Sequence, residues 1–208
     1  MNLLTHCVSE NIINCSRFAK NAFIFCSMNE ENLIQKLKDP SHKRMAFHEL
    51  VVTYQEKLYW HVRKIVIDHD DADDIMQNVF IKVWNSIDSF RGDSSLFTWL
   101  YRIATNESLT FLAQKKKRKG FWSLSEDEYL VEKLHADDYF DGEQAQKMLM
   151  EAVVRLPEKQ RLVFNMKYFD EMKYEEISEI LNVTTGALKA SYHHAVKKIE
   201  EFINNRVN

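Results

Sequence analysis

Glycine, proline and cysteine are scarce in this 208-residue sequence, which has four glycines, two prolines and three cysteines. Glycine and proline are the residues that interrupt helices, and no strand-and-turn pattern of alternating apolar residues is present. The scarcity therefore predicts an all-α protein. The cysteines, Cys7, Cys15 and Cys26, are odd in number and have spacings that match no zinc motif. They suggest neither a disulfide framework nor a structural zinc site.

Long apolar runs and catalytic motifs are also missing. No apolar segment approaches the length needed to cross a bilayer, so no membrane insertion is expected. Residues 22–26 are too short for the core of a secretory signal. There is no phosphate-binding glycine loop, nucleophile elbow or zinc motif, so the sequence predicts no enzyme, no metal and no cofactor. The acidic residues within 68–74 lie where a helix is expected to begin, and carboxylates there act as helix caps.

The net charge of −3 conceals an uneven distribution. Residues 120–143 contain one lysine and eight acidic residues, whereas the blocks on either side are slightly basic. The overall charge therefore does not exclude nucleic acid as a partner. We interpret residues 119–143 as an acidic linker. Its scattered aromatic and aliphatic residues leave two readings open: a charged surface loop, or a segment that docks in a basic channel of a partner.

Residues 71–106 are the most informative stretch. Two helices are expected, at 71–89 and 95–114, with Asp70 or Asp71 capping the first. Helical spacing places six apolar residues on one face of the first helix: Ala72, Ile75, Val79, Phe80, Val83 and Ile87. Core packing is expected for three further residues of this stretch: Trp84, Leu100 and Ile103.

The second half of this stretch combines aromatic, cationic and amide side chains. Residues 90–95 form a short loop, and Trp99, Arg102 and Asn106 follow on the next helix. Flat aromatic rings beside arginine and asparagine suit single-stranded bases, which stack on ring faces and are hydrogen-bonded at their edges. The basic run at 115–119 lies just downstream, where it can hold phosphates.

The remaining segments complete two helical domains. Residues 29–68 read as two helices separated at Pro40, so that residues 29–118 form a four-helix bundle. Residues 144–208 read as a second four-helix domain, in which Pro157 separates the first two helices. Its last two helices, 174–181 and about 186–203, flank a turn at 182–184 and form a helix-turn-helix. Four apolar residues are expected to pack these two helices together: Ile177, Leu181, Val183 and Leu188.

Several motifs resemble extracytoplasmic-function sigma factors, the small promoter-recognition subunits of bacterial RNA polymerase. Residues 71–80, 90–94 and 98–106 are similar to region two of this family, and the segments beginning at Leu156, Tyr174 and Gly186 are similar to region four, in the same order. The resemblance implies a partnership with core RNA polymerase and promoter DNA, and a cytoplasmic location. It also implies an anti-sigma factor and a linker that threads through the polymerase.

The resemblance also implies three sets of contact residues. Those expected to bind core polymerase are Asp73, Asp74, Gln77 and Phe80. Those expected to open and hold the minus-ten element, including the upstream phosphates, are Phe90, Arg91, Gly92, Ser94, Trp99, Arg102, Asn106, Lys115, Lys116 and Arg118. Those expected at the minus-35 element are Thr184, Thr185, Lys189, Ser191, His193, His194 and Lys197.

The last helix departs from the family pattern. Family members commonly carry three arginines at positions that hold Lys189, Ser191 and His194 here. Lysine lacks the bidentate fork that arginine offers to guanine, so we expect residues 144–208 alone to bind DNA weakly. The family also typically begins near Met28, and we expect residues 1–27 to be an upstream misread or a dispensable tail.

Two alternatives use fewer of these features. A one-component DNA-binding regulator would use only residues 144–208, but it would need a sensor domain where residues 29–118 show a strand-melting pattern. A helical protein-interaction adaptor would use the acidic linker as its docking segment.

Overall fold

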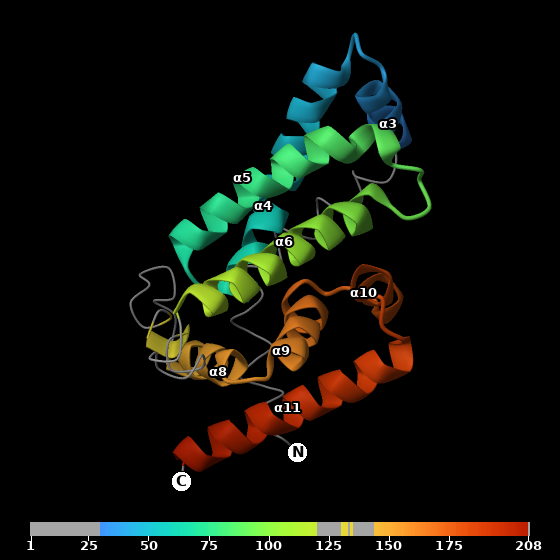
Figure 1. Cartoon of the computed structure of the whole chain (residues 1–208). Helices are drawn as coiled ribbons and strands as arrows, with labels where there is room; N and C mark the ends of the chain where they lie inside the picture. The colour runs from blue at the N-terminus through green and yellow to red at the C-terminus, as the bar shows by residue number, and fades with distance from the viewer. Residues whose placement is uncertain (1–29, 120–129, 133, 135–143, 208) are drawn as a thin grey trace. The chain divides into compact units, whose positions relative to one another are not determined.

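The computed structural model describes residues 30–119, 130–132, 134 and 144–207 (Figure 1). All regular structure within these ranges is helical, which confirms the predicted all-α fold. Expectations for the three cysteines and for Met28 fall outside the described residues. The chain divides into two compact units, 1–50 and 51–208, which are described separately. The predicted domain limits at 29–118, 119–143 and 144–208 therefore remain a prediction.

The first unit contains helix α3 (Glu30–Lys38) and the beginning of α4 (Lys43–Val66). Leu33 and Leu37 are buried on α3, as are Ala46 and Leu50 on α4. The turn between the helices contains Pro40, as predicted, and is held by Asp39. Its carboxylate accepts from the Ser41 amide at 3.0 Å and contacts the His42 ring at 2.5 Å, so the break is fixed by local hydrogen bonds.

A tight turn joins α4 to α5 (His69–Ser86) within the second unit. Ile67 adopts a left-handed conformation (φ 67°), and Asp68 follows as the helix cap. The Asp68 carboxylate accepts from the Asp71 amide at 3.1 Å. The predicted caps, Asp70 and Asp71, are therefore wrong. The helix begins two residues earlier than periodicity indicated, because the chain reverses at Ile67 and leaves Asp68 in the extended conformation that a cap needs.

Helix α5, the short helix η1 (Ile87–Ser89) and α6 (Leu96–Lys119) pack against one another (Figure 1). The predicted apolar stripe of α5 is buried except for Phe80, which is partly exposed. Leu100 is buried, as expected, whereas Ile103 is partly exposed and Trp84 is 37% exposed. The core prediction for Trp84 is therefore wrong. Each residue turns a helix by 100°, which carries Trp84 about 120° from the middle of the buried stripe.

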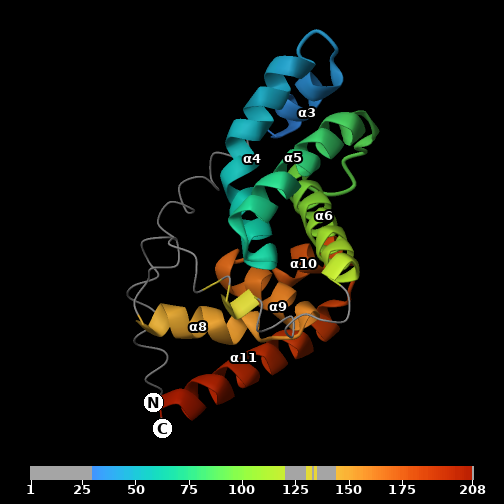
Figure 2. The same ribbon diagram turned by 60° about the vertical axis from the view of Figure 1, so that its left-hand side comes forward.

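The C-terminal half of the second unit consists of α8 (Gln144–Val154), α9 (Glu158–Phe164), the π-helical turn η4 (Asn165–Phe169), α10 (Tyr174–Leu181) and α11 (Thr185–Val207). Figure 2 shows α8 and α9 beside the long helix α11, and the contacts between these helices agree. Pro157 separates α8 from α9, as predicted. Six buried residues form the core of this part: Ala152, Val153, Leu156, Phe164, Ala195 and Ile199.

Helices α10 and α11 form the predicted helix-turn-helix. Asn182 ends α10 in the left-handed conformation (φ 53°), which asparagine tolerates better than most residues. Ile177 and Leu188 are buried as expected, but Val183 is 39% exposed and its core prediction is wrong. The left-handed turn at Asn182 rotates the chain after α10 and carries Val183 outward. Ile180, one helical turn after Ile177, is buried.

Candidate polymerase and nucleic-acid interface

The exposed face of α5 carries both acidic and apolar side chains. Asp73, Asp74 and Gln77 are exposed, and Phe80 is partly exposed. Successive turns add Ile81, 60% exposed, and Trp84 to the same side of the helix. Sequence reasoning missed Ile81 and assigned Trp84 to the core. The missed signal is a pair of apolar residues three apart on the side opposite the buried stripe.

The acidic cluster at the start of α5 is dispersed among several partners. Asp68 caps the helix, Asp71 forms an ion pair with Lys115 on α6, and Asp73 lies 3.7 Å from the His69 ring. Within the described ranges, no group of three or more histidine, cysteine or acidic residues is placed to hold a metal ion. Asp68 therefore fixes the start of α5, and Asp71 joins this helix to α6.

The loop at 90–95 sets an aromatic pair at the start of α6. Phe90 is buried, and its ring centroid lies 5.1 Å from that of Trp99 at an interplanar angle of 50°. Gly92 (φ 80°) allows the left-handed turn between them. The Ser95 hydroxyl accepts from the Thr98 amide at 3.1 Å and so caps α6. The buried Phe90 ring thus packs against Trp99, which is partly exposed.

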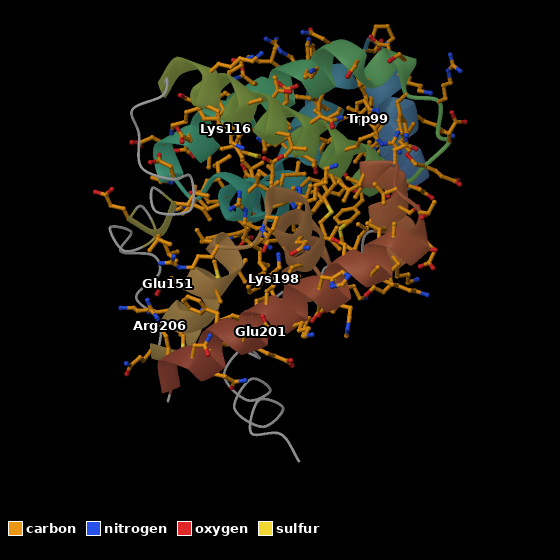
Figure 3. The ribbon with its side chains drawn as sticks, turned by 60° about the horizontal axis from the view of Figure 1, so that its bottom comes forward. Trp99, Lys116, Glu151, Lys198, Glu201 and Arg206 are labelled. Atoms are coloured by element: carbon orange, nitrogen blue, oxygen red, sulfur yellow. The ribbon has the colours of Figure 1, made fainter. Side chains whose placement is uncertain are left out.

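Three predicted DNA-contact residues lie on one face of α6. Trp99, Arg102 and Asn106 follow at spacings of three and four residues, within about 60° of one another around the helix axis. Asn106 is exposed, and Trp99 and Arg102 are partly exposed. In the loop before them, Arg91 and Gly92 are exposed and Ser94 is partly exposed. The hairpin end therefore brings an aromatic face, a cation and an amide to one surface, with Trp99 marked in Figure 3.

The basic run at 115–119 is the last part of α6 itself. Because successive residues of a helix are 100° apart, its lysine side chains point in different directions. Lys115 forms an ion pair with Asp71, and the Lys116 ammonium lies 3.1 Å from the Glu158 carboxylate on α9. Lys117 is exposed, and the side chain of Arg118 lies outside the described atoms. Two of the expected phosphate-binding lysines are thus engaged with carboxylates in this structure.

The residues predicted to contact the minus-35 element lie on more than one face of α11. Thr185, Lys189, His193 and Lys197 follow at four-residue spacing and form one ridge along the helix. Ser191 and His194 lie off this ridge, and Ser191 is partly buried. Thr184 is exposed at the turn, where its hydroxyl accepts from the Ala187 amide at 3.4 Å. The seven predicted residues therefore cannot all face one groove at once.

Family comparisons agree with this layout. The family model described as Sigma-70 region 2 matches residues 50–118, and Sigma-70, region 4 matches residues 146–199. The ECF RNA polymerase sigma factor SigW of Bacillus subtilis is 31% identical over 158 residues, 71% of this chain and 83% of the relative. This chain is an ECF sigma factor. The ECF RNA polymerase sigma-E factor of Escherichia coli K12 is 29% identical over 188 residues, 86% of this chain and 95% of the relative.

Solved structures support the fold of this sigma factor. The structure of CnrH with the cytosolic domain of CnrY is 19% identical, with a TM-score of 0.62, and covers 85% of this chain and 97% of CnrH. The sigma factor RpoE, solved with the anti-sigma factor NepR from Bartonella quintana, is 21% identical, with a TM-score of 0.57, and covers 76% and 96% of the two chains.

Membership in this family fixes the general function. The protein is a transcription initiation factor of RNA polymerase and not an enzyme. The two alternatives, a one-component regulator and an interaction adaptor, are overturned by matches to both sigma regions in the expected order. No helix in the described part of the chain is both long and apolar enough to cross a bilayer.

Proposed function

We propose that this sigma factor binds core polymerase through the exposed face of α5. The contacts are Asp73, Asp74, Gln77 and Phe80, together with the neighbouring Ile81 and Trp84. Protein interfaces commonly surround an apolar or aromatic centre with a polar rim, and this face has that composition. It is supported from behind by the buried stripe of α5, so its side chains are held on a rigid element.

Replacement of Trp84 by alanine tests this proposal. A central aromatic contact is worth about 2 kcal/mol or more, so affinity for core polymerase should fall about 30-fold. Asn85→Ala, at the next exposed position of the same helix, is the matched control. Affinity is measured with labelled full-length protein titrated with core polymerase. Equal affinities of the two variants and the parent would contradict the proposed surface.

The hairpin end between α5 and α6 is proposed to open the minus-ten element. The observation that carries this proposal is the Phe90–Trp99 pair, in which a buried ring fixes the orientation of a partly exposed one. A base extruded from the duplex loses a few kcal/mol of stacking, and stacking on an aromatic ring returns about 1–3 kcal/mol. Arg91, Gly92 and Ser94 would track the strand beside it, and Arg102 and Asn106 would contact the base edge and backbone.

Run-off transcription on duplex and pre-melted templates tests this role. Trp99→Ala should lower product from the duplex promoter by about five- to 150-fold, because about 1–3 kcal/mol of stacking is lost. A template already unpaired around the minus-ten element should largely restore transcription. Thr110→Ala, exposed on the same helix, serves as control. An equal defect on both templates would place the role of Trp99 outside strand opening.

The remaining DNA contacts are assigned to cations and to α11. Lys115, Lys116 and Arg118 would bind upstream phosphates, each adding about 0.9 to the dependence of log affinity on log salt concentration. The ridge of Thr185, Lys189, His193 and Lys197 would enter the minus-35 groove. Thr184, Ser191 and His194 would contact the flanking backbone. Without the arginine fork, binding outside the polymerase complex is expected to be weak. Tight, sequence-specific binding of DNA by the free protein would contradict this assignment.

The last part of the proposal concerns an inhibitory partner and the location of the protein in the cell. The related structures of CnrH and RpoE contain CnrY and the anti-sigma factor NepR, respectively. We infer that this sigma factor is also held by an anti-sigma factor and acts in the cytoplasm. Affinity purification from the native host, followed by mass spectrometry, should recover either core polymerase or a separate inhibitory protein. Recovery of the chain in the periplasmic fraction would overturn the cytoplasmic assignment.

A further inference from the structure

Two adjacent histidines lie on the outer side of α11. Helices α8, α9 and α10 all pack on the other side of this helix, as Figures 1 and 2 both show. The buried residues Ala195 and Ile199 mark that inner side, whereas His193 and His194 are exposed. Each residue turns the helix by 100°, so the two imidazoles point about 130° to either side of the buried direction. They therefore face away from the protein and diverge from each other by about 100°.

Small residues precede the histidines on the same outer side. Gly186 and Ala190 are exposed on the two preceding turns, and a Cβ added to Gly186 would meet nothing within 4 Å. The first turns of α11 therefore present no bulky side chain in this direction. A DNA major groove is about 12 Å wide and admits one helix, so the groove can approach α11 closely enough for the imidazoles to reach it.

The charges closest to the histidines along α11 are positive. Three lysines lie about one helical turn from one or other ring: Lys189, Lys197 and Lys198. The carboxylates of this helix, Glu200 and Glu201, lie seven residues after His193 and His194, which is about 10 Å further along the axis. An imidazolium here adds a cation to a basic surface, and such a surface is favourable only when an anion covers it.

The elements packed against α11 leave the histidines without an acidic partner. Charged and titratable groups on these elements are engaged with other residues: Glu151, Glu158, Arg161, Lys167, Tyr174 and Glu176. Glu175 and Glu179 on α10 are exposed. Within the described residues, no hydrogen bond or ion pair joins either histidine to a carboxylate. The two rings contact each other, with centroids 6.0 Å apart at an interplanar angle of 56°.

The tyrosine next to the histidines adds no charge of its own. Burial raises the pKa of Tyr192, and the Tyr174 phenol, whose ring lies edge-on at 6.5 Å, raises that pKa further. Burial also raises the pKa of Tyr174. Both phenols therefore stay neutral between pH 6 and 8. Histidine is the side chain whose charge normally changes in this range, so a change in pH acts on this surface through the two imidazoles.

We propose that His193 and His194 form a pH-dependent contact with the minus-35 element, through which promoter affinity rises as the pH falls from 8 to 6. A charged imidazole donates from both ring nitrogens, whereas a neutral one donates from a single nitrogen. His193 lies on the ridge proposed to enter the groove, and His194 points toward the phosphates beside it. A phosphate favours the charged ring, so binding takes up protons. This inference rests on the minus-35 contacts proposed above.

The expected size of the effect is about ten-fold in affinity. A hydrogen bond from a charged donor to phosphate is stronger than a neutral one by about this factor. The two rings are close enough to repel each other when both are charged, so the pair should add little more than one such bond. The sigma factor would then use its promoters more strongly when the medium around the polymerase becomes acidic.

Binding of the complete holoenzyme to a duplex promoter fragment at pH 6, 7 and 8, at constant ionic strength, tests this proposal. The double variant with His193→Gln and His194→Gln is neutral throughout this range, and the one with His193→Lys and His194→Lys is charged throughout. Affinities are compared as ratios at each pH, so the pH dependence of the polymerase itself cancels. The ratio of parent to glutamine variant should fall from about ten at pH 6 to about one at pH 8. The ratio of lysine to glutamine variant should stay constant.

Two controls accompany these variants. His48→Gln, at an exposed position of α4, should keep the profile of the parent. A fragment in which the minus-35 element is replaced should bind parent and glutamine variant equally at every pH. Circular dichroism checks that each variant is folded.

Two outcomes would overturn the inference, and they differ in what they say of the proposed function. A constant ratio of parent to glutamine variant, with tighter binding by the lysine variant, would overturn the response to pH but keep the minus-35 contact. Equal affinities of the lysine and glutamine variants at every pH would overturn both, because a charge at these positions would then not reach DNA.

Discussion

The buried carboxylate of Glu151 predicts an unequal response to removal of its two partners. Its side chain on α8 is 4% exposed, and it accepts from both terminal nitrogens of Arg206 on α11, at 2.7 and 2.8 Å. Arg155 adds a third bond at 3.0 Å. Glu151 and Arg206 lie side by side in Figure 3. Together they fix the C-terminal end of α11 to the first helix of region 4.

Arg206→Ala and Glu151→Ala should therefore differ in cost. Arg206→Ala removes two of the hydrogen bonds that this buried carboxylate accepts, and we expect a loss of about 2–3 kcal/mol in local stability. Glu151→Ala removes the buried charge itself, and Arg206, 49% exposed, returns to water. That loss should be about 1 kcal/mol. The double variant should resemble Glu151→Ala, because the stranded charge is then absent.

Hydrogen exchange of the full-length protein measures this difference. Amides in peptides covering 144–154 and 199–206 should exchange about 30- to 150-fold faster in Arg206→Ala and about five-fold faster in Glu151→Ala. Lys198→Ala, exposed on the same helix, is the control. A larger effect of Glu151→Ala than of Arg206→Ala, or additive effects in the double variant, would refute the reasoning from burial.

Three further predictions concern the helix-turn-helix and the buried carboxylate of Asp170. Asn182→Val should lower the thermal unfolding midpoint of region 4 by a few degrees, because a β-branched residue in the left-handed conformation costs about 1–2 kcal/mol, whereas Asn182→Gly should leave it nearly unchanged. Leu188→Ala should cost about 2–5 kcal/mol and abolish transcription that depends on the minus-35 element, while affinity for core polymerase is kept. Asp170 accepts a hydrogen bond from His61 and forms an ion pair with Lys64, both on α4. Because the folded protein lowers the pKa of Asp170, the stabilisation from these two contacts is complete above the ordinary aspartate value of 3.8 and is lost as pH falls through the lowered value. Small-angle scattering should then show expansion only on the acidic side of that value, and expansion between pH 5 and 7 would contradict the assignment.

Helix positions were predictable because apolar periodicity and scarce breakers point to the same segments. Residues 174–181 form α10 as expected, and Pro40 and Pro157 separate helices where predicted. Errors occur where a turn rotates the chain. Val183 follows the left-handed Asn182, and the cap of α5 follows the left-handed Ile67. Periodicity along one helix carries no information about such a rotation.

The polar contacts between distant segments could not be predicted at all. His61 and Asp170 are 109 residues apart, and neither belongs to a motif that marks a partner. Glu151 and Arg206 are likewise joined only by the packing of α8 on α11. For the candidate site, the residue types in 71–106 were sufficient to predict which surface binds polymerase and DNA. Only the structure distinguished Phe90, which is buried, from Trp99, which is partly exposed, and added Ile81 to the face of α5.

The positions of the tryptophans make the intrinsic fluorescence of this sigma factor a probe of its binding steps. All four tryptophans lie between residues 60 and 122, and none lies in region 4. Trp84 and Trp99 stand on separate faces, one proposed for polymerase and one for the melted strand. Single replacement of either by phenylalanine would therefore separate the emission change on polymerase binding from the quenching by an unpaired base. Docking and strand opening could then be timed in one stopped-flow experiment without an attached dye.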